Sequence, residues 1–281
     1  MSPTWQADTP PDPVRIPPLG WLLVLVRGVP LALLVFGGLA LLLALRLIER
    51  PIHGLHRPWT PRITQIVCRN ALRIMGITFT NRGEVMPHHG ALVANHSSWL
   101  DIFTLNAQQR VYFVSKAEVA GWPGIGWLAR ATGTVFIERD RRQARDHNRL
   151  FEDRLGAGHK LLFFPEGTST DGLRVLPFRT TLFAAFFAEP LRDTTWIQPV
   201  TVRYRAPRGR PARFYGWWGE MDFGTDLLKI LAQSPQGGVE VIHGTPLRVA
   251  DFPDRKALAR AAEEAVRAGL ADAPGDSRAG A

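Results

Sequence analysis

The most pronounced hydrophobic feature of the chain is an almost wholly apolar segment near the N-terminus, residues 20–48. Between Arg27 and Arg46 this segment carries no charge and would extend roughly 27 Å as a helix, close to the hydrocarbon thickness of a bilayer. The two arginines can reach the interfaces at its ends. The pattern predicts a retained membrane anchor, either a spanning helix or, if Pro30 and nearby glycines interrupt it, a re-entrant or interfacial hairpin.

The segments on either side of the anchor have different patterns. Residues 1–19 are rich in proline and show little hydrophobic periodicity, which predicts a disordered or extended tail. Residues 49–80 place isoleucine and valine at helical spacing with arginines on another face, typical of a basic amphipathic helix on anionic lipid or of an ordinary helix packed on the domain. Many arginines follow the anchor, whereas the tail before it has only Arg15, set against Asp8 and Asp12. The positive-inside rule therefore predicts that the rest of the chain faces the cytoplasm, at an inner or plasma membrane.

Short apolar runs alternate with helical stretches over residues 81–253, and this alternation predicts an α/β domain with a mostly parallel mixed sheet flanked by helices. Beyond it, Asp254 is suited to cap a helix, so residues 254–281 are expected to form a C-terminal helix and a flexible tail. The expected strands are 91–95, 111–114, 134–138, 160–164, 196–200 and 239–244. The expected helices within the domain are 98–107, 123–131, 141–157 and 178–188.

Charge and cysteine content narrow the possible classes. The 281 residues carry 34 Lys and Arg against 25 Asp and Glu, a formal charge of +9. This excess predicts an anionic partner, which is a membrane surface, a nucleic acid or a charged small substrate. The single cysteine, Cys68, excludes an internal disulfide framework and a cysteine-rich zinc site, and it is expected to be buried or interfacial rather than a nucleophile.

The first candidate site is the sequence NHSSWLD, residues 95–101, which directly follows an expected strand. A sharp turn would bring His96 and Asp101 together as a base and the carboxylate that orients it. Such a pair can take the proton of a substrate hydroxyl, which then occupies the place of the serine in a protease triad. The alternative is a polar turn with a helix cap made by Asn95, Ser97 and Ser98.

The second candidate site is FFPEGTSTDG, residues 163–172, which again follows an expected strand. Glu166, Gly167 and Thr168 lie in a turn rich in backbone N–H groups, a geometry suited to a phosphate or another polar head group. An ordinary turn is the alternative. The segment lacks the lysine of a nucleotide-binding P-loop.

Together with two further motifs, these segments resemble the glycerolipid acyltransferase family, which includes the 1-acylglycerol-3-phosphate acyltransferases. The resemblance covers roughly residues 60–250 and rests on four ordered blocks, namely NHSSWLD, GTVFIER, FPEG and IQPV, with VSKAE at 114–118 between the first two. It implies that His96 and Asp101 are catalytic. The substrate-binding residues that it implies are Asn95, Lys116, Gly133, Phe136, Arg139, Phe164, Pro165, Glu166, Gly167, Thr168 and Pro199.

The activity implied by this resemblance is transfer of a fatty acyl group from acyl-CoA or acyl carrier protein to the free hydroxyl of a lysolipid. Because the thioester co-substrate is already activated, no covalent enzyme intermediate, metal or further cofactor is expected. The expected partners are the lysolipid, the thioester carrier and membrane lipid, without nucleic acid.

One departure from the family pattern bears on the acceptor. Many members that acylate lysophosphatidic acid continue the third block as GTRS, whereas this chain has Ser169 in place of that arginine. An arginine can bind a phosphate through two parallel hydrogen bonds, which a serine cannot do. This departure counts against a phosphate-bearing acceptor. The resemblance implies lysophosphatidic acid as the first expectation, and the alternative is the zwitterionic lyso-ornithine lipid, to whose acyltransferases FPEGTSTDG followed by VLPF is similar.

Two other classes remain as alternatives. A lipid hydrolase would need a positioned nucleophile, yet the chain has no Gly-X-Ser-X-Gly elbow. A non-enzymatic basic module on membrane or nucleic acid would use the arginines between Arg203 and Arg213 together with Tyr204, Phe214 and Tyr215. For that stretch, a solvated loop that touches anionic lipid or acyl carrier protein is the simpler interpretation.

Overall fold

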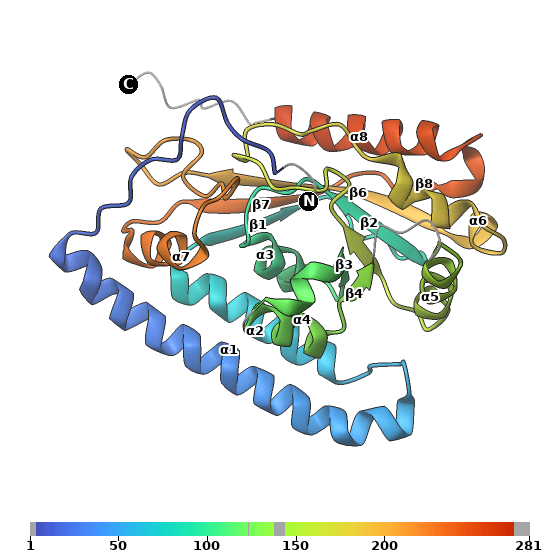
Figure 1. The fold of residues 1–281 in the computed structure, drawn as a ribbon, viewed down its shortest axis with the longest axis horizontal. Coiled ribbons are helices and arrows are strands. Elements are labelled where there is room, and N and C mark those ends of the chain that lie inside the picture. Colours follow the sequence, from blue (N-terminus) through green and yellow to red (C-terminus); the bar gives the residue numbers. More distant parts are fainter. Residues whose placement is uncertain (1–3, 123, 138–143, 273–281) are drawn as a thin grey trace.

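The structure, a computed structural model, describes residues 4–122, 124–137 and 144–272. In this part of the chain, an eight-stranded sheet has the order β1-β7-β6-β2-β5-β3-β4, with β8 paired to β6 (Figure 1). Neighbouring strands are parallel except for β6 with β7 and β6 with β8. The predicted α/β class with a mostly parallel mixed sheet is confirmed. The strands are β1 Thr78–Arg82, β2 Gly90–Ala94, β3 Tyr112–Lys116, β4 Val135–Ile137, β5 Leu161–Phe163, β6 Trp196–Arg205, β7 Gly238–His243 and β8 Leu247–Arg248.

Helices cover both faces of the sheet, and the alternation of strand side chains divides the core between them. On β2, Leu92 and Ala94 face one core cluster, whereas Ala91 and Val93 face the other. The first face packs against α2 Thr60–Met75, α3 Asp101–Gln108 and α7 Phe223–Ala232, with α4 Ile125–Thr132 beside α2. The second packs against α5 Ala144–Gly156, the 3-10 helix η3 Thr180–Phe187 and α8 Arg255–Ala271. Short connections complete the fold: η1 Ala117–Gly121, α6 Leu191–Thr194 and η4 Val249–Asp251.

The apolar N-terminal segment forms one helix, α1 Pro18–His53, which lies along the outside of α2 and α7 (Figure 1). It passes through Pro30 without a break, so the predicted hairpin does not form. Gly20, Leu31 and Leu42 are buried at intervals of eleven residues, about three helical turns, and therefore form one stripe toward the domain. Helix α1 approaches α2 closely at Gly38, where a Cβ would lie 2.5 Å from a methyl group of Val67.

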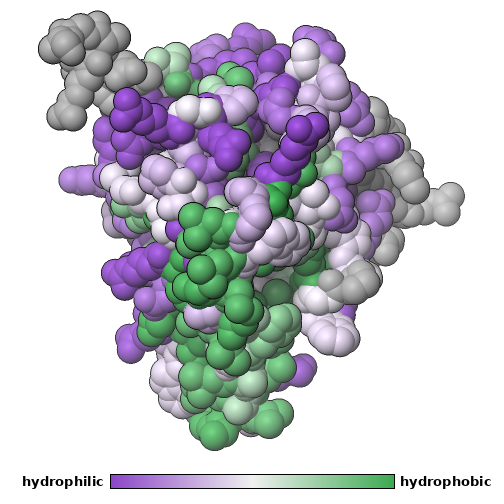
Figure 2. All heavy atoms as spheres, turned by 90° about the vertical axis from the view of Figure 1, so that its left-hand side faces the viewer, coloured by the Kyte–Doolittle hydropathy of each residue, from purple (hydrophilic) through white to green (hydrophobic). Residues whose placement is uncertain are grey.

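The outer side of α1 is exposed and apolar over nearly the whole helix. Figure 2 shows this surface gathered at the lower end of the molecule, below a largely hydrophilic body. A helix of 36 residues is about 54 Å long, well beyond the roughly 30 Å of a hydrocarbon core. The exposed large apolar side chains are Leu19, Trp21, Leu22, Leu25, Val26, Val29, Leu33, Phe36, Leu41, Leu43, Leu47, Ile48 and Ile52.

Polar contacts fix α1 to the domain near both ends. Arg27 Nη1 donates to the carbonyl oxygens of Leu231 at 3.0 Å and Gln233 at 2.6 Å, at the C-terminus of α7. Near the other end, the buried Glu49 accepts hydrogen bonds from the backbone N–H groups of Trp59 and Thr60 at the start of α2. These contacts bind the helix to the domain along its length rather than at one end.

The N-terminal tail is extended and contacts the domain over the part that the structure describes. The backbone N–H of Trp5 donates to Thr168 Oγ1 at 3.3 Å, and its ring lies edge-on to that of Trp218. Further along, Asp12 forms an ion pair with Arg213 at 2.9 Å. Of the predicted disordered or extended tail, the described residues 4–17 therefore take the extended form, and they pack beside the FPEGTSTDG segment.

Several elements differ from those predicted. The anchor extends beyond 20–48 because Glu49, although charged, is buried and stays helical. Strand β1 was missed because it is a mostly exposed edge strand with polar residues at four of its five positions. Helix α7 was also missed, although Asp222 caps it by accepting from Thr225 N at 2.7 Å. The helix expected at 178–188 is a 3-10 helix rich in Thr and Phe, residues with modest helix propensity.

A substitution at Gly90, at the start of β2, tests the register of the central strands β2 and β6. Its φ is +150°, and a Cβ would lie 1.8 Å from the carbonyl oxygen of Trp196 on β6. We expect Gly90→Ala to destabilise the protein by several kcal/mol, on the order of 3, because the two backbones must separate. Thermal unfolding in detergent measures this, with Gly156→Ala as the control because nothing lies within 4 Å of its Cβ position. Equal melting temperatures for the two variants would contradict the register.

Candidate active site

The two predicted motifs meet at one edge of the sheet. Strands β2 and β5 are parallel neighbours, with Val93 opposite Phe163. The carboxyl ends of parallel strands lie at the same edge. His96 follows β2 by two residues and Phe164 follows β5 directly, so both side chains project from that edge.

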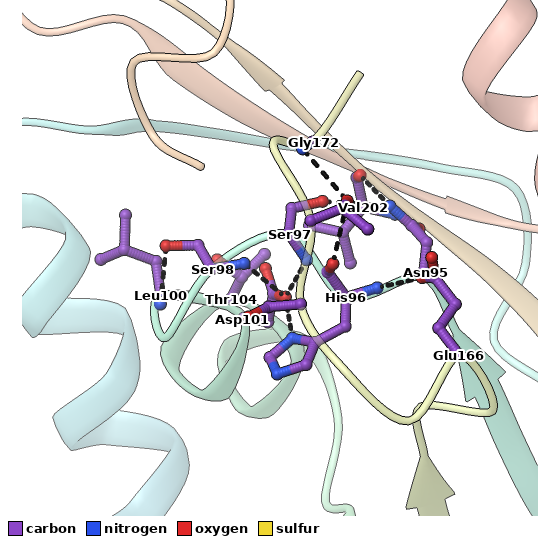
Figure 3. A network of polar contacts seen from close by, with 12 residues as sticks. Asn95, His96, Ser97, Ser98, Leu100, Asp101, Thr104, Glu166, Gly172 and Val202 are labelled. Carbon is purple, nitrogen blue, oxygen red and sulfur yellow. Dashed lines mark hydrogen bonds and ion pairs between the residues drawn. The ribbon is translucent and has the colours of Figure 1, made fainter. Parts of the chain in front are cut away.

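His96 and Asp101 are in contact, as their spacing predicts (Figure 3). His96 Nδ1 lies 2.7 Å from Asp101 Oδ2, which also accepts hydrogen bonds from the backbone N–H groups of Ser97 at 2.8 Å and Ser98 at 3.0 Å. Asp101 is the first residue of α3, so its carboxylate satisfies N–H groups at the turn that begins this helix. The turn thereby makes the carboxylate a fixed partner of the imidazole.

The outer side of the imidazole remains accessible. The His96 side chain is 22% exposed, whereas that of Asp101 is fully buried. The ring stacks on Phe164, with centroids 4.1 Å apart and an angle of 12° between the planes. Its Nε2 makes no hydrogen bond to any residue in the described part of the chain. With Nδ1 bound to a carboxylate, Nε2 can accept the proton of a hydroxyl group that reaches it from outside.

Glu166 of the FPEG motif holds the backbone of His96 in place. Its Oε1 accepts from His96 N and its Oε2 from Leu176 N, both at 2.7 Å, and the residue is almost completely buried. On the other side, Thr170 N donates to His96 O at 3.0 Å. The segment after β5 therefore wraps around His96, and Glu166 is directed toward backbone rather than toward an open surface.

Asn95 is also directed inward. Its side chain is fully buried and forms two hydrogen bonds with the backbone of Val202 on β6, accepting from N at 2.8 Å and donating to O at 2.9 Å. Its Nδ2 also lies 3.2 Å from Ser97 Oγ. The amide thus extends the pairing of β2 with β6 beyond the end of β2 and fixes the chain just before His96.

Comparison with known proteins fits this site. A family model described as Acyltransferase matches residues 72–203, which include both motifs. A lyso-ornithine lipid O-acyltransferase from Rhodobacter capsulatus is 60% identical over 269 residues, covering 95% of this chain and 97% of the relative. The chain belongs to the acyltransferase family.

Two further relatives show the breadth of this acyltransferase family. A 1-acyl-sn-glycerol-3-phosphate acyltransferase from Neisseria gonorrhoeae is 35% identical, covering 68% of this chain and 74% of the relative. The crystal structure of the 1-acyl-sn-glycerophosphate acyltransferase from Thermotoga maritima matches with a TM-score of 0.64 at 20% identity, covering 90% of this chain and 95% of that one. At that identity the likeness concerns the fold.

The residues that the family resemblance implied near the acceptor lie at different ends of the sheet. Lys116 is the last residue of β3. Phe136, on β4, pairs with Ser115 of β3, so both Lys116 and Phe136 lie toward the edge of the sheet that carries His96. Gly133 precedes β4 and lies at the opposite edge. There its φ of +85° ends α4, and a Cβ would meet the Arg57 guanidinium at 2.8 Å, which explains the glycine without a ligand. Arg139 lies outside the described residues.

The remaining motif residues shape the loop after β5 and strand β6. Pro165 O accepts from Arg179 N at 2.9 Å, and Gly167 has a φ of +75° beside the Arg179 side chain. Thr168 accepts from the N-terminal tail, as described above. Pro199 is buried within β6 and pairs with Val93 of β2, which precedes His96 by three residues. The structure thus brings His96, Asp101, Phe164 and Glu166 together and places Pro165, Gly167 and Pro199 in the backbone around them.

The serines that a hydrolase would use and two of the aromatic residues that a nucleic-acid-binding module would use are buried in the domain. Ser97 and Ser98 are buried, and neither hydroxyl contacts the His96 ring. Phe214 and Tyr215 are buried in the core, so their rings are not available for stacking on bases. Among the described residues no group of three or more His, Cys, Asp and Glu is arranged to hold a metal ion.

One residue of the site was missed by the sequence analysis. The hydroxyl of Tyr204 on β6 donates to Asp101 Oδ1 at 2.7 Å. A signal was present in the strand alternation: Val200 and Val202 belong to the core cluster on the face of α3, and Tyr204 is the next residue on that face. In the sequence, however, it stood among arginines and was grouped with them.

The buried Glu166 predicts a pH-dependent stability. Burial raises its pKa to about 8, although the N–H groups of Leu176 and His96 act in the opposite direction. A carboxyl with a raised pKa stabilises the fold below its ordinary value of 4.5, and this contribution is lost as the pH rises through about 8. We expect the melting temperature of the wild type to fall between about pH 5 and pH 9, and that of Glu166→Gln to fall less.

Glu263→Gln is the control for this prediction, because Glu263 also accepts a backbone hydrogen bond, from Phe178 N at 2.7 Å, but lies away from His96. Its melting curve against pH should run parallel to that of the wild type. A Glu166→Gln profile as steep as the wild type would contradict the assignment.

Proposed function

We propose that this acyltransferase moves a fatty acyl group from a thioester carrier to the free hydroxyl of a lysolipid, with His96 as general base. The observation that carries the proposal is the His96–Asp101 contact of 2.7 Å, combined with an accessible Nε2 on the outer side of the ring. Asp101 holds the imidazole in the tautomer whose Nε2 is the acceptor and stabilises the imidazolium that forms.

The reaction needs one proton carrier and no covalent enzyme intermediate. His96 Nε2 takes the proton of the acceptor hydroxyl while its oxygen attacks the thioester carbonyl carbon. The tetrahedral intermediate then collapses, the carbon–sulfur bond breaks, and the leaving thiolate takes the proton from the imidazolium. The products are the acylated lipid and a free thiol, carried by coenzyme A or by acyl carrier protein.

For the acceptor we favour lyso-ornithine lipid over lysophosphatidic acid. The sequence motifs alone favour lysophosphatidic acid, but the 60% identical relative is a lyso-ornithine lipid O-acyltransferase. Ser169 supports the same choice, since it stands where phosphate-using members have an arginine and is itself buried. A zwitterionic head group has less need of a bidentate cation at this position.

The test of the function is an acylation assay with purified protein in detergent, offering lyso-ornithine lipid and lysophosphatidic acid in parallel. We expect transfer chiefly to lyso-ornithine lipid and a loss of at least about a thousandfold for His96→Ala, because no other described group can take the proton. His56→Ala serves as the control, since this exposed histidine lies in the loop between α1 and α2.

Three outcomes would contradict parts of this proposal. Full activity of His96→Ala would refute the base, and a preference for lysophosphatidic acid would refute the acceptor. Release of fatty acid from acyl-CoA without any acceptor would indicate a hydrolase instead.

The mode of membrane attachment that we propose is supported by the contacts of the segments before and after α1. The residues before α1 contact the domain through Trp5 and Asp12, and the residues after it form the domain. These contacts support an arrangement in which both ends of α1 are on one side of the membrane and the helix lies along one leaflet with its apolar outer side in lipid. We place the domain on the cytoplasmic side because the loop and helix after α1 are rich in arginine.

Labelling of single cysteines in sealed vesicles tests this arrangement. Asp8→Cys in the tail and Arg208→Cys in the domain are exposed positions on either side of α1 in the sequence. Both should react with a membrane-impermeant maleimide in inside-out vesicles, and neither in right-side-out vesicles. The wild type is the control, because Cys68 is buried and burial raises its pKa to about 12. Labelling of the two positions from opposite sides would show that α1 spans the bilayer.

A further inference from the structure

The carboxylate of Asp101 is completely buried, so each of its oxygen atoms needs a hydrogen-bond donor. Oδ2 receives three donors, namely His96 Nδ1 and the backbone N–H groups of Ser97 and Ser98. Oδ1 receives one, the hydroxyl of Tyr204 at 2.7 Å. The phenol is therefore the donor on which Oδ1 depends among the residues that the structure describes.

The chemistry of this phenol suits a permanent donor. Burial raises the pKa of Tyr204 well above its usual range, and the neighbouring charge of Asp101 acts in the same direction. The hydroxyl therefore keeps its proton at neutral pH. Its oxygen also lies 3.3 Å from Thr104 Oγ1, one turn along α3 from Asp101, which fixes the orientation of the phenol.

We propose that Tyr204 is a positioning residue of the acyl-transfer site: its hydroxyl sets the rotation of the Asp101 carboxylate, and through it the orientation of the His96 ring. Tyr204 does not touch the ring or the reacting atoms. It comes from β6, whereas Asp101 begins α3, so the contact ties the sheet to the helix that carries the carboxylate. This inference rests on the proposed function of His96 as base.

The contact acts on the chemical step rather than on binding. Without the phenol, Oδ1 lacks a donor in a dry interior, and the carboxylate can rotate to share the N–H groups of Ser97 and Ser98 between its two oxygens. That rotation moves Oδ2 away from His96 Nδ1 and leaves the imidazole free to turn about its own side-chain bonds. A misoriented base lowers the rate of proton transfer while the surface that binds the lipid is unchanged.

The decisive variant is Tyr204→Phe, which removes only the hydroxyl. We expect kcat for acyl transfer to fall about tenfold, with KM for both substrates within about twofold of the wild type. Tyr215→Phe is the matched control: Tyr215 is a buried tyrosine whose ring lies 5.5 Å from that of Tyr204, and its hydroxyl bonds Gln236 and Gly237 instead of Asp101. This control should lower the melting temperature without changing kcat.

Three results would overturn the inference: kcat of Tyr204→Phe within about twofold of the wild type, a loss confined to KM, or an equal loss of kcat in Tyr215→Phe. If Tyr204→Phe is not obtained in folded form, Thr104→Val decides. Valine keeps the shape of threonine but removes the hydroxyl beside the phenol, and we expect kcat to fall about twofold to threefold. In that case, an unchanged kcat in Thr104→Val overturns the inference.

The failure of this inference is distinguishable from failure of the proposed function. If His96→Ala abolishes transfer while Tyr204→Phe retains full kcat, the base stands and the positioning role falls. If His96→Ala itself retains full activity, the proposed function falls whatever Tyr204→Phe does.

Discussion

The architecture of the site depends on the hydrogen bonds that satisfy one completely buried carboxyl group, that of Asp101. An ionised group in the interior is tolerated only when hydrogen bonds replace its hydration. At Asp101 the hydrogen bonds come from two parts of the chain: the turn after β2, with the His96 imidazole and the N–H groups of Ser97 and Ser98, and the hydroxyl of Tyr204 on β6. Both parts are held by contacts of their own, so the sheet, the first turn of α3 and the loop after β5 must all be in place before the His96 imidazole has its orientation.

The same site is connected to the apolar helix α1 through α7. The indole N–H of Trp99, within the first motif, donates to Asp226 on α7 at 2.9 Å. The C-terminal carbonyls of α7 are in turn bound by Arg27 of α1. Two hydrogen-bonded contacts thus link the turn that carries His96 and Asp101 to the apolar helix α1.

Much of this site could be predicted from the sequence, and the part that could not has a physical reason. The contact of His96 with Asp101 spans five residues, so local spacing was sufficient. The strands of the central sheet were recognised from their apolar runs. The roles of Glu166 and Tyr204, by contrast, require partners 70 and 103 residues away. Pairings at that separation are set by strand order and register, which hydrophobic periodicity does not encode.

The contacts of α1 limit how the chain can be truncated. Leu72, Met75 and Leu231 belong to a core cluster that α1 helps to cover, and Arg27 donates hydrogen bonds to carbonyl groups at the C-terminus of α7. Deleting the first 53 residues would uncover that core and leave an aggregation-prone fragment instead of a soluble enzyme. A water-soluble form is better sought by replacing the apolar residues on the outer side of α1 with polar ones, while its domain-facing stripe is retained.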